Sequence, residues 1–152
     1  MKAVVQRVTE ARVTVEGKTL GEIGPGLLVL AAVEKDDTLT EIEWTANKIV
    51  TLRIFRNGDK YFDQDVKQIN GSILLVSNFT VAGETRKGRR PGLEGAAPPE
   101  KGRELFDQFV EAVKRLEVPV ATGEFQAEMK VSLVNDGPVT FLVESPKGTD
   151  NR

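Results

Sequence analysis

The stretch GPGLLVLAAV, residues 24–33, sets the frame of the fold. Its opening Gly-Pro-Gly breaks the chain, and the apolar run from Leu27 to Val33 has the length of a strand. Because no polar residue alternates with the apolar ones, such a strand is expected to be covered on both faces. We therefore place a buried strand at residues 27–33 and predict the rest of the fold outward from it.

Upstream of this run, the sequence predicts three strands, at residues 2–8, 11–15 and 18–23. The first is rich in Val, and the second alternates apolar and polar residues, as a half-buried strand does. The third follows Glu16-Gly17, which is expected to form a turn.

Downstream, the spacing of the apolar residues changes to that of a helix, from about Thr38 to Leu52. Thr38 followed by Glu41 three residues later is typical of a capping box at a helix start. A second helix is expected to start at Pro98-Pro99, which suits a first helical turn, and to end before Pro119. One face of this second helix carries Leu105, Phe109, Val113 and Leu116.

The remaining strands are expected at residues 53–55, 72–79, 128–134 and 139–143. With these strands and two main helices, the sequence predicts an α+β fold with a largely antiparallel, curved or barrel-like sheet. One domain is expected over residues 1–144, and residues 145–152 are expected to be a flexible C-terminal tail.

Composition restricts the chemistry that this chain can perform. Its 152 residues suit one domain, and they include neither Cys nor His. A Ser-His-Asp triad and a Cys-His pair are therefore excluded, and a zinc site would need carboxylates alone. We expect no metal and no cofactor, so an enzyme of this composition must use hydroxyls, carboxylates, amines, backbone groups or the substrate itself.

Targeting signals are also absent from the sequence. No stretch approaches the ~20 apolar residues of a membrane span, and the N-terminus begins as a strand rather than a signal peptide. A cytosolic protein without a membrane anchor is therefore expected. The net charge of −2 gives no general attraction to nucleic acid, so RNA binding would need a local patch.

One such patch is a basic run inside a long loop at residues 82–98, consisting of Arg86, Lys87, Arg89 and Arg90. From composition alone, a solvated loop is the better interpretation. A structureless loop of this length is nevertheless often functional.

Two polar segments are candidates for a site. Ser77-Asn78-Phe79-Thr80 ends a buried strand, where hydroxyls commonly cap backbone groups. The segment at residues 135–140, NDGPVT, has the composition of a hairpin turn. The pattern alone favours these structural interpretations for both segments.

Several segments, taken in order, carry a resemblance to one protein family: MKAVVQRV at 1–8, VTV at 13–15, GPGLLVL at 24–30, VEKDD at 33–37, RIF at 53–55, GSILLVS at 71–77 and MKVSLVNDGPVTF at 129–141. Together they resemble the bacterial D-aminoacyl-tRNA deacylase family. The segment at 129–141 is the most specific, and only about the last eight residues lie outside the resemblance.

The resemblance implies a deacylase-type fold, a homodimer and a set of site residues. Ser77, Asn78, Phe79 and Thr80 would line the pocket for the 3′-terminal aminoacyl-adenosine of the tRNA. Asn78 stands where the family has Gln, which shortens that side chain by one methylene and puts the reach of its contact in doubt. The family's Gly-cisPro pair, which enters the partner subunit's active site, corresponds to Gly137 and Pro138.

Three further positions are implied as supporting residues. Arg7 and Met129 match family positions near the pocket, with Arg7 expected to brace the Gly-Pro loop, and Asn135 belongs to the same motif. With the family in view, the basic run at residues 86–90 becomes a candidate for contacts to tRNA phosphates.

The implied function is hydrolysis of the ester bond in D-aminoacyl-tRNA, with L-aminoacyl-tRNA rejected by a rigid wall at Gly137 and Pro138. Glycyl-tRNA, which has no side chain to exclude, is then expected to be cleaved as well. Catalysis would use either the 2′-hydroxyl of the terminal ribose, which we favour, or Thr80 as a nucleophile. Backbone N–H groups after the strand would hold the oxyanion.

Two other functions stay open at this point. One is a nucleic-acid-binding homodimer of the same fold without catalysis, which would have no use for a cis-proline wall. The other is a piece of a synthetase editing domain, although the short chain with its own Met1 favours a free-standing enzyme.

Overall fold

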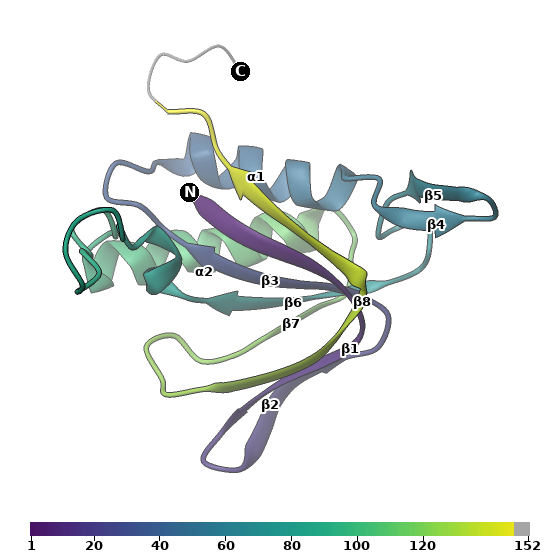
Figure 1. Ribbon diagram of the computed structural model, residues 1–152, viewed down its shortest axis with the longest axis horizontal. Helices are drawn as coiled ribbons and strands as arrows, with labels where there is room; N and C mark the ends of the chain where they lie inside the picture. Colours follow the sequence, from purple (N-terminus) through teal and green to yellow (C-terminus); the bar gives the residue numbers. More distant parts are fainter. Residues whose placement is uncertain (148–152) are drawn as a thin grey trace.

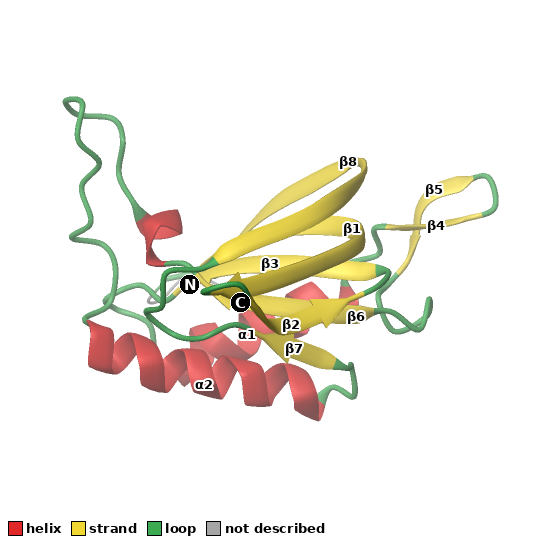
Figure 2. Cartoon of the chain, turned by 90° about the horizontal axis from the view of Figure 1, so that it is seen from below, coloured by secondary structure: helices red, strands yellow, loops and turns green. Residues whose placement is uncertain are grey.

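The computed structural model describes residues 1–147, in which a strongly curved sheet has two helices packed along one side (Figures 1 and 2). In chain order the elements are β1 (Lys2–Val15), β2 (Lys18–Ile23), β3 (Gly26–Ala32), α1 (Leu39–Thr51), β4 (Phe55–Asn57), β5 (Lys60–Gln64), β6 (Ser72–Ser77), the 3₁₀ helix η1 (Phe79–Ala82), α2 (Pro99–Arg115), β7 (Val120–Thr122) and β8 (Lys130–Glu144).

The main sheet has the strand order β2-β1-β3-β6-β7, and β8 pairs with the other edge of β1. β1 runs antiparallel to β2, β3 and β8, whereas β3-β6 and β6-β7 are parallel pairs. The predicted α+β class with two helices is confirmed. The parallel pairs were not predicted, and they exist because α1 and α2 lie in the connections that return the chain to the same end of the sheet.

Both helices begin as the sequence predicts. Thr38 is the N-cap of α1, and its backbone N–H donates to the Glu41 carboxylate at 2.8 Å, which completes the capping box. α2 begins at Pro99, and Leu105, Phe109 and Val113 of its predicted apolar face are buried.

The central strands are buried on both faces, as expected for residues 27–33. Leu27 and Val29 face a core beneath α1 and α2. Leu28 faces a second core inside the curl of the sheet, together with Val13 and Leu74. The curl nearly closes on itself, because a Cβ added to Gly21 in β2 would lie 2.6 Å from the backbone oxygen of Thr122 in β7.

The largest correction concerns residues 135–138, which do not form a hairpin turn. β8 is one strand, and both of its halves run antiparallel to β1. Gln6 pairs with Thr140 and Val8 pairs with Asn135, so residues 136–139 bulge out opposite Arg7 alone. Turn-forming residues therefore serve here to loop a segment out of a continuous strand.

Other boundaries differ from the prediction. Residues 2–15 form one strand rather than two, and the strand expected at 53–55 lies at 55–57. β5 and β7 were missed, because each is short and neither alternates clearly. β6 ends at Ser77, so Asn78 already belongs to the start of η1.

Both ends of the described chain meet beside α1. The Met1 ammonium group lies 2.7 Å from Asp37 Oδ1 and donates to Ser145 Oγ at 2.6 Å. Lys147 forms an ion pair with Glu34 at 3.3 Å. Of the tail expected at 145–152, Ser145 is thus buried and bonded, and residues 148–152 lie outside the described residues.

Candidate active site

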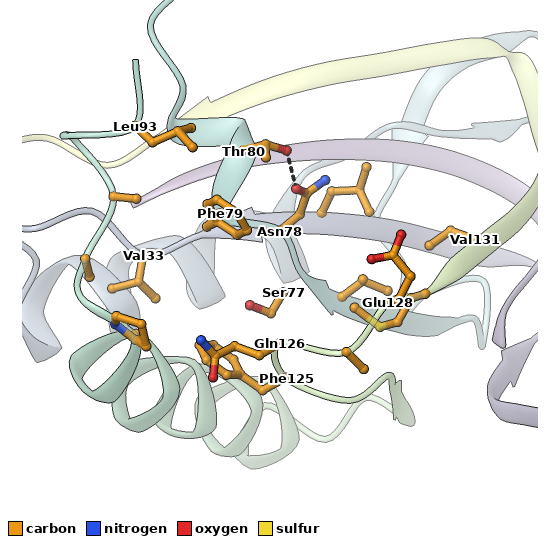
Figure 3. A pocket seen from close by; sticks show the side chains of 18 of the residues that line it. Val33, Ser77, Asn78, Phe79, Thr80, Leu93, Phe125, Gln126, Glu128 and Val131 are labelled. Atoms are coloured by element: carbon orange, nitrogen blue, oxygen red, sulfur yellow. Dashed lines mark hydrogen bonds between the residues drawn. The ribbon is translucent and has the colours of Figure 1, made fainter. Parts of the chain in front are cut away.

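A cleft of about 880 Å³ opens between β6 with η1, the start of α2, and the segment that leads into β8 (Figure 3). Leu30, Val76 and Val131 are among the apolar residues that line it. Such a cavity is large enough for a ligand the size of a nucleoside that carries an amino acid.

The predicted segment Ser77–Thr80 forms one wall of this cleft. Ser77 is the last residue of β6, and its side chain points into the cavity (Figure 3). The Asn78 N–H donates to the Ala31 carbonyl at 2.8 Å, which anchors the segment to β3. The chain then turns into η1, so the amide groups of Phe79 and Thr80 fall in a first helical turn, where N–H groups have no partner within the helix.

The Thr80 hydroxyl donates to Asn78 Oδ1 at 2.6 Å (Figure 3). The acceptor is an amide oxygen, which does not take a proton at neutral pH. Phe79 in this wall is exposed, with 57% of its surface accessible, so its ring is available for stacking.

The sequence does not predict the opposite wall. Phe125 lines the cleft, and its ring packs against Phe106 with centroids 6.4 Å apart. Gln126 and Glu128 lie beside it at the rim (Figure 3). The only signal for this wall was an aromatic residue in a segment without helix or strand periodicity.

Met129 also lines the cleft, next to Gly123. A Cβ at Gly123 would lie 2.6 Å from Met129 Sδ, so the missing side chain makes room for the thioether. The structure thus brings Ser77, Asn78, Phe79, Thr80 and Met129 together around one cavity.

Gly137 and Pro138 lie elsewhere, on the exposed bulge of β8, and neither lines the cleft of its own chain. The peptide bond between them is cis. Gly137 has φ of +136°, and a Cβ at this position would lie 2.7 Å from Val139 Cγ2 and 3.0 Å from the Tyr61 hydroxyl oxygen. Both the backbone conformation and the space therefore require glycine.

Arg7 lies beneath the bulge and is only 3% exposed. Its Nε donates to the Asp136 carbonyl at 3.0 Å, and its Nη1 donates to the Ile54 carbonyl at 2.9 Å. The Asp136 carboxylate lies 3.7 Å from Nε and supplies the nearby negative charge. A buried guanidinium is thereby satisfied mainly by backbone oxygens of two separate segments.

Asn135 closes the base of the bulge from the other side. Its Nδ2 donates to the Arg7 carbonyl and to the Val139 carbonyl, each at 2.9 Å. One amide therefore ties both ends of the looped-out segment to β1. The structure brings Arg7, Asn135, Gly137 and Pro138 together at this second location.

The basic run lies at the tip of a loop that projects from the body of the molecule (Figure 2). Glu84 and Gly92 close the base of this loop with two backbone hydrogen bonds of 2.8 Å. Arg86 is held by Glu84, with 3.7 Å between Nε and the carboxylate. All four cationic residues are exposed, and the loop returns to the body through Leu93, which lines the cleft.

Within residues 1–147, no three carboxylate side chains converge to form a group that could hold a metal ion. None of the helices in this part of the chain is long and apolar enough to span a membrane.

Comparisons with known proteins give a consistent result. A profile of the family described as D-Tyr-tRNA(Tyr) deacylase matches residues 4–144. A D-aminoacyl-tRNA deacylase of Pelobacter propionicus is 55% identical over 144 residues, which is 95% of this chain and 99% of the relative. One from Geobacter sulfurreducens is 53% identical and covers 95% of each chain.

Two solved structures share the fold. A protein described as c-Myc DNA Unwinding Element Binding Protein superposes with a TM-score of 0.92 and 39% identity, covering 97% of this chain and all of the other. A probable eukaryotic D-amino acid tRNA deacylase gives a TM-score of 0.80 at 17% identity, covering 94% of this chain and 98% of the other, which shows a common fold alone.

Proposed function

Since this chain belongs to the D-Tyr-tRNA(Tyr) deacylase family, we infer that it hydrolyses the ester bond between a D-amino acid and the 3′ end of tRNA, in the cytosol where tRNA is charged. The observation that carries this conclusion is the family match over residues 4–144. The cleft walled by Ser77–Thr80 supports it, because an opening of about 880 Å³ accommodates an aminoacyl-adenosine.

For the catalytic step, we propose that the 2′-hydroxyl of the terminal ribose assists attack on the ester. An aminoacyl ester is already activated, and a vicinal hydroxyl held near the carbonyl replaces much of a protein base. The Thr80 hydroxyl is a poor nucleophile here, because its proton is bound to an amide oxygen rather than to a base. The Phe79 and Thr80 N–H groups at the start of η1 would stabilise the oxyanion.

For chiral selection, we propose a homodimer in which the Gly137–Pro138 bulge of one subunit closes the cleft of the other. The bulge is exposed, it is absent from its own cleft, and Arg7 and Asn135 hold its backbone in place. A stiff backbone wall excludes the side chain of an L-residue more effectively than an apolar pocket could discriminate. In β8 beyond the bulge, Phe141 and Leu142 are 40% and 58% exposed, which supports a protein contact on this side.

For tRNA binding, we propose that the loop bearing Arg86, Lys87, Arg89 and Arg90 contacts backbone phosphates. Its exposed charges offer the attraction that the net charge of −2 does not. Phosphate contacts of this kind would not distinguish among tRNAs.

A nucleic-acid-binding dimer without catalysis is the second candidate. The specific observation in its favour is that one similar solved structure is described as a DNA unwinding element binding protein. Binding without cleavage is therefore an outcome that the experiment must be able to detect.

The test is to incubate the protein with D-tyrosyl-tRNA, L-tyrosyl-tRNA and glycyl-tRNA and to follow deacylation of each. We expect cleavage of the D-aminoacyl and glycyl substrates and no acceleration for the L-aminoacyl substrate. Retention of all three tRNAs on the protein without cleavage would support the binding function instead. An unchanged glycyl-tRNA alongside cleaved D-tyrosyl-tRNA would contradict selection by exclusion.

A further inference from the structure

Tyr61 connects a peripheral hairpin to the bulge. It lies in β5 of the β4–β5 hairpin, which projects from one end of the sheet (Figure 1). Its hydroxyl accepts a hydrogen bond from Arg7 Nη2 at 3.1 Å. The Arg7 guanidinium carbon also lies 4.8 Å from the centre of the Tyr61 ring, so this residue contacts the charged group through two features.

The ring of Tyr61 is held by a second cation. The guanidinium carbon of Arg56, on the partner strand of the hairpin, lies 4.4 Å from the ring centre. Tyr61 also packs against Phe62, with 4.8 Å between ring centres. These contacts fix where the Tyr61 hydroxyl lies, although 37% of the residue is exposed.

The same hydroxyl lies directly against the bulge. It is 3.0 Å from the position that a Cβ would take at Gly137. One oxygen atom therefore fills the space beside Gly137 and serves as an acceptor for the buried Arg7, whose Nε holds the neighbouring Asp136 carbonyl. Loss of this oxygen would leave a buried guanidinium N–H unsatisfied and open space beside the glycine.

We propose that Tyr61 is a positioning residue for chiral selection: it fixes Arg7 and abuts Gly137, so that the bulge cannot retreat from the amino acid in the facing cleft. This inference rests on the proposed function. A wall excludes L-residues only while it cannot move away from them. The Tyr61 hydroxyl packs against Gly137 and blocks that movement of the bulge. Tyr61 touches no substrate in this account and acts only through Arg7 and Gly137.

The test replaces Tyr61 with Phe, which keeps the ring and its stacking on both arginines and removes only the hydroxyl. We expect the ratio of kcat/KM for D-tyrosyl-tRNA over that for L-tyrosyl-tRNA to fall about tenfold. The free energy lost when a buried donor is left unsatisfied corresponds to roughly this factor in an equilibrium constant. Glycyl-tRNA, which has no side chain for the wall to exclude, is expected to be cleaved at the wild-type rate.

The matched control is Asn57→Ala. The Asn57 side chain donates to Asp63 at 2.8 Å within the same hairpin, and this hydrogen bond does not involve Arg7. If Tyr61 served only to hold the hairpin together, both variants would lower the melting temperature and leave the D/L ratio unchanged. That result, or an unchanged ratio in a folded and active Tyr61→Phe protein, would overturn the proposal.

A second readout separates this proposal from the proposed function. The ¹⁵N–¹H resonance of Arg7 Nε reports the position of the guanidinium in the folded protein without any substrate. It is expected to shift in Tyr61→Phe and to stay in place in Asn57→Ala. Wild-type protein that leaves D-tyrosyl-tRNA intact would refute the deacylase function, whereas an unshifted Arg7 resonance would refute the role of Tyr61.

Discussion

At the scale of single residues, the bulge of β8 depends on a buried cation and a glycine. The Arg7 guanidinium binds backbone oxygens at residues 54 and 136, so one side chain sets the distance between two segments far apart in the sequence. Replacing a partner of such a group is costly, because the remaining charge stays buried. Gly137 contributes to the bulge because it has no side chain, which lets its backbone pack closely against Val139 and the Tyr61 hydroxyl.

Gly137→Ala is therefore expected to destabilise the protein by about 2–4 kcal/mol, because the strain of a positive φ adds to a steric clash. Gly17→Ala is the matched control, since Gly17 also has a positive φ of +81° but nothing lies within 4 Å of its Cβ position. This control should cost only about 1 kcal/mol. Urea unfolding measures both, and equal losses would contradict the packing described around Gly137.

Thr80→Val tests the catalytic scheme. Because the Thr80 hydroxyl is bonded to an amide oxygen rather than to a base, the variant should keep its kcat within about tenfold of the wild-type value. By contrast, a tRNA whose terminal ribose carries hydrogen in place of the 2′-hydroxyl should lose at least about 10³-fold in rate. Single-turnover deacylation measures both effects. Loss of activity in Thr80→Val with a normal rate on the deoxy substrate would identify Thr80 as the nucleophile.

At the scale of elements, the sequence predicts what depends on periodicity and misses what depends on pairing. The buried strand at 27–33 and the capping box at Thr38 follow from local patterns, and the structure contains both. The parallel pairing of β3 with β6 is set by contacts between distant segments, and nothing local encodes it. β7 has only three residues, too few for a period to be recognised.

The candidate site divides in the same way. The resemblance supplied Ser77–Thr80 and Gly137–Pro138, but pattern alone suggested a strand end and a hairpin turn. Composition correctly marked residues 135–138 as irregular, yet it could not distinguish a chain reversal from a bulge, because both use the same residues. No sequence pattern marks Phe125 or Tyr61, since their importance depends on the residues that they contact across the fold.

The loop at residues 82–98 carries its own prediction. Arg90→Gln should weaken tRNA binding and reduce the slope of log K against log salt concentration by up to about 0.9, the value for one phosphate contact. Lys67→Gln, at an exposed turn residue away from the loop and the cleft, is the control and should leave the slope unchanged. Binding measured by filter retention at several salt concentrations gives both slopes. Equal slopes for the two variants would remove the loop from tRNA binding.

At the scale of the whole molecule, Met1 and Lys147, the two ends of the described part of the chain, meet at a cluster of charges that includes Glu34 and Asp37. Burial alone would raise the pKa of Glu34, but attraction and hydrogen bonding to the Met1 ammonium group, with a contribution from Lys147, lower it below its ordinary value of 4.5. A carboxyl whose pKa is lower in the folded state adds stability above its ordinary pKa. That contribution is lost as the pH falls through the lowered value.

Glu34→Gln should accordingly cost about 1–2 kcal/mol of unfolding free energy at pH 7, allowing for partial solvent screening. The difference from wild type should shrink as the pH falls below 4.5. Glu43→Gln, at an exposed position on α1, is the control and should have little effect at any pH. Urea unfolding across this pH range measures the difference. A Glu34→Gln penalty that grows in acid would contradict the sign of the pKa shift.

The central claim concerns two copies of the molecule, with the bulge of one acting on the cleft of the other. Pro138→Ala weakens the wall and leaves the cleft of the same chain intact, because Pro138 does not line it. Ala96→Trp blocks the cleft that Ala96 lines and leaves the bulge intact. In a dimer that contains one subunit of each variant, only the Pro138→Ala subunit has an open cleft, and only the Ala96→Trp subunit has an intact bulge. The open cleft therefore meets the intact bulge only if the bulge acts across the interface.

The most direct measurement is therefore the D/L ratio of kcat/KM for the purified mixed dimer of Pro138→Ala and Ala96→Trp subunits, compared with the Pro138→Ala homodimer. The account predicts that the homodimer cleaves L-tyrosyl-tRNA and that the mixed dimer regains the stereoselectivity of the wild type. A mixed dimer as unselective as the homodimer, or a protein that stays monomeric while it discriminates D from L, would contradict it.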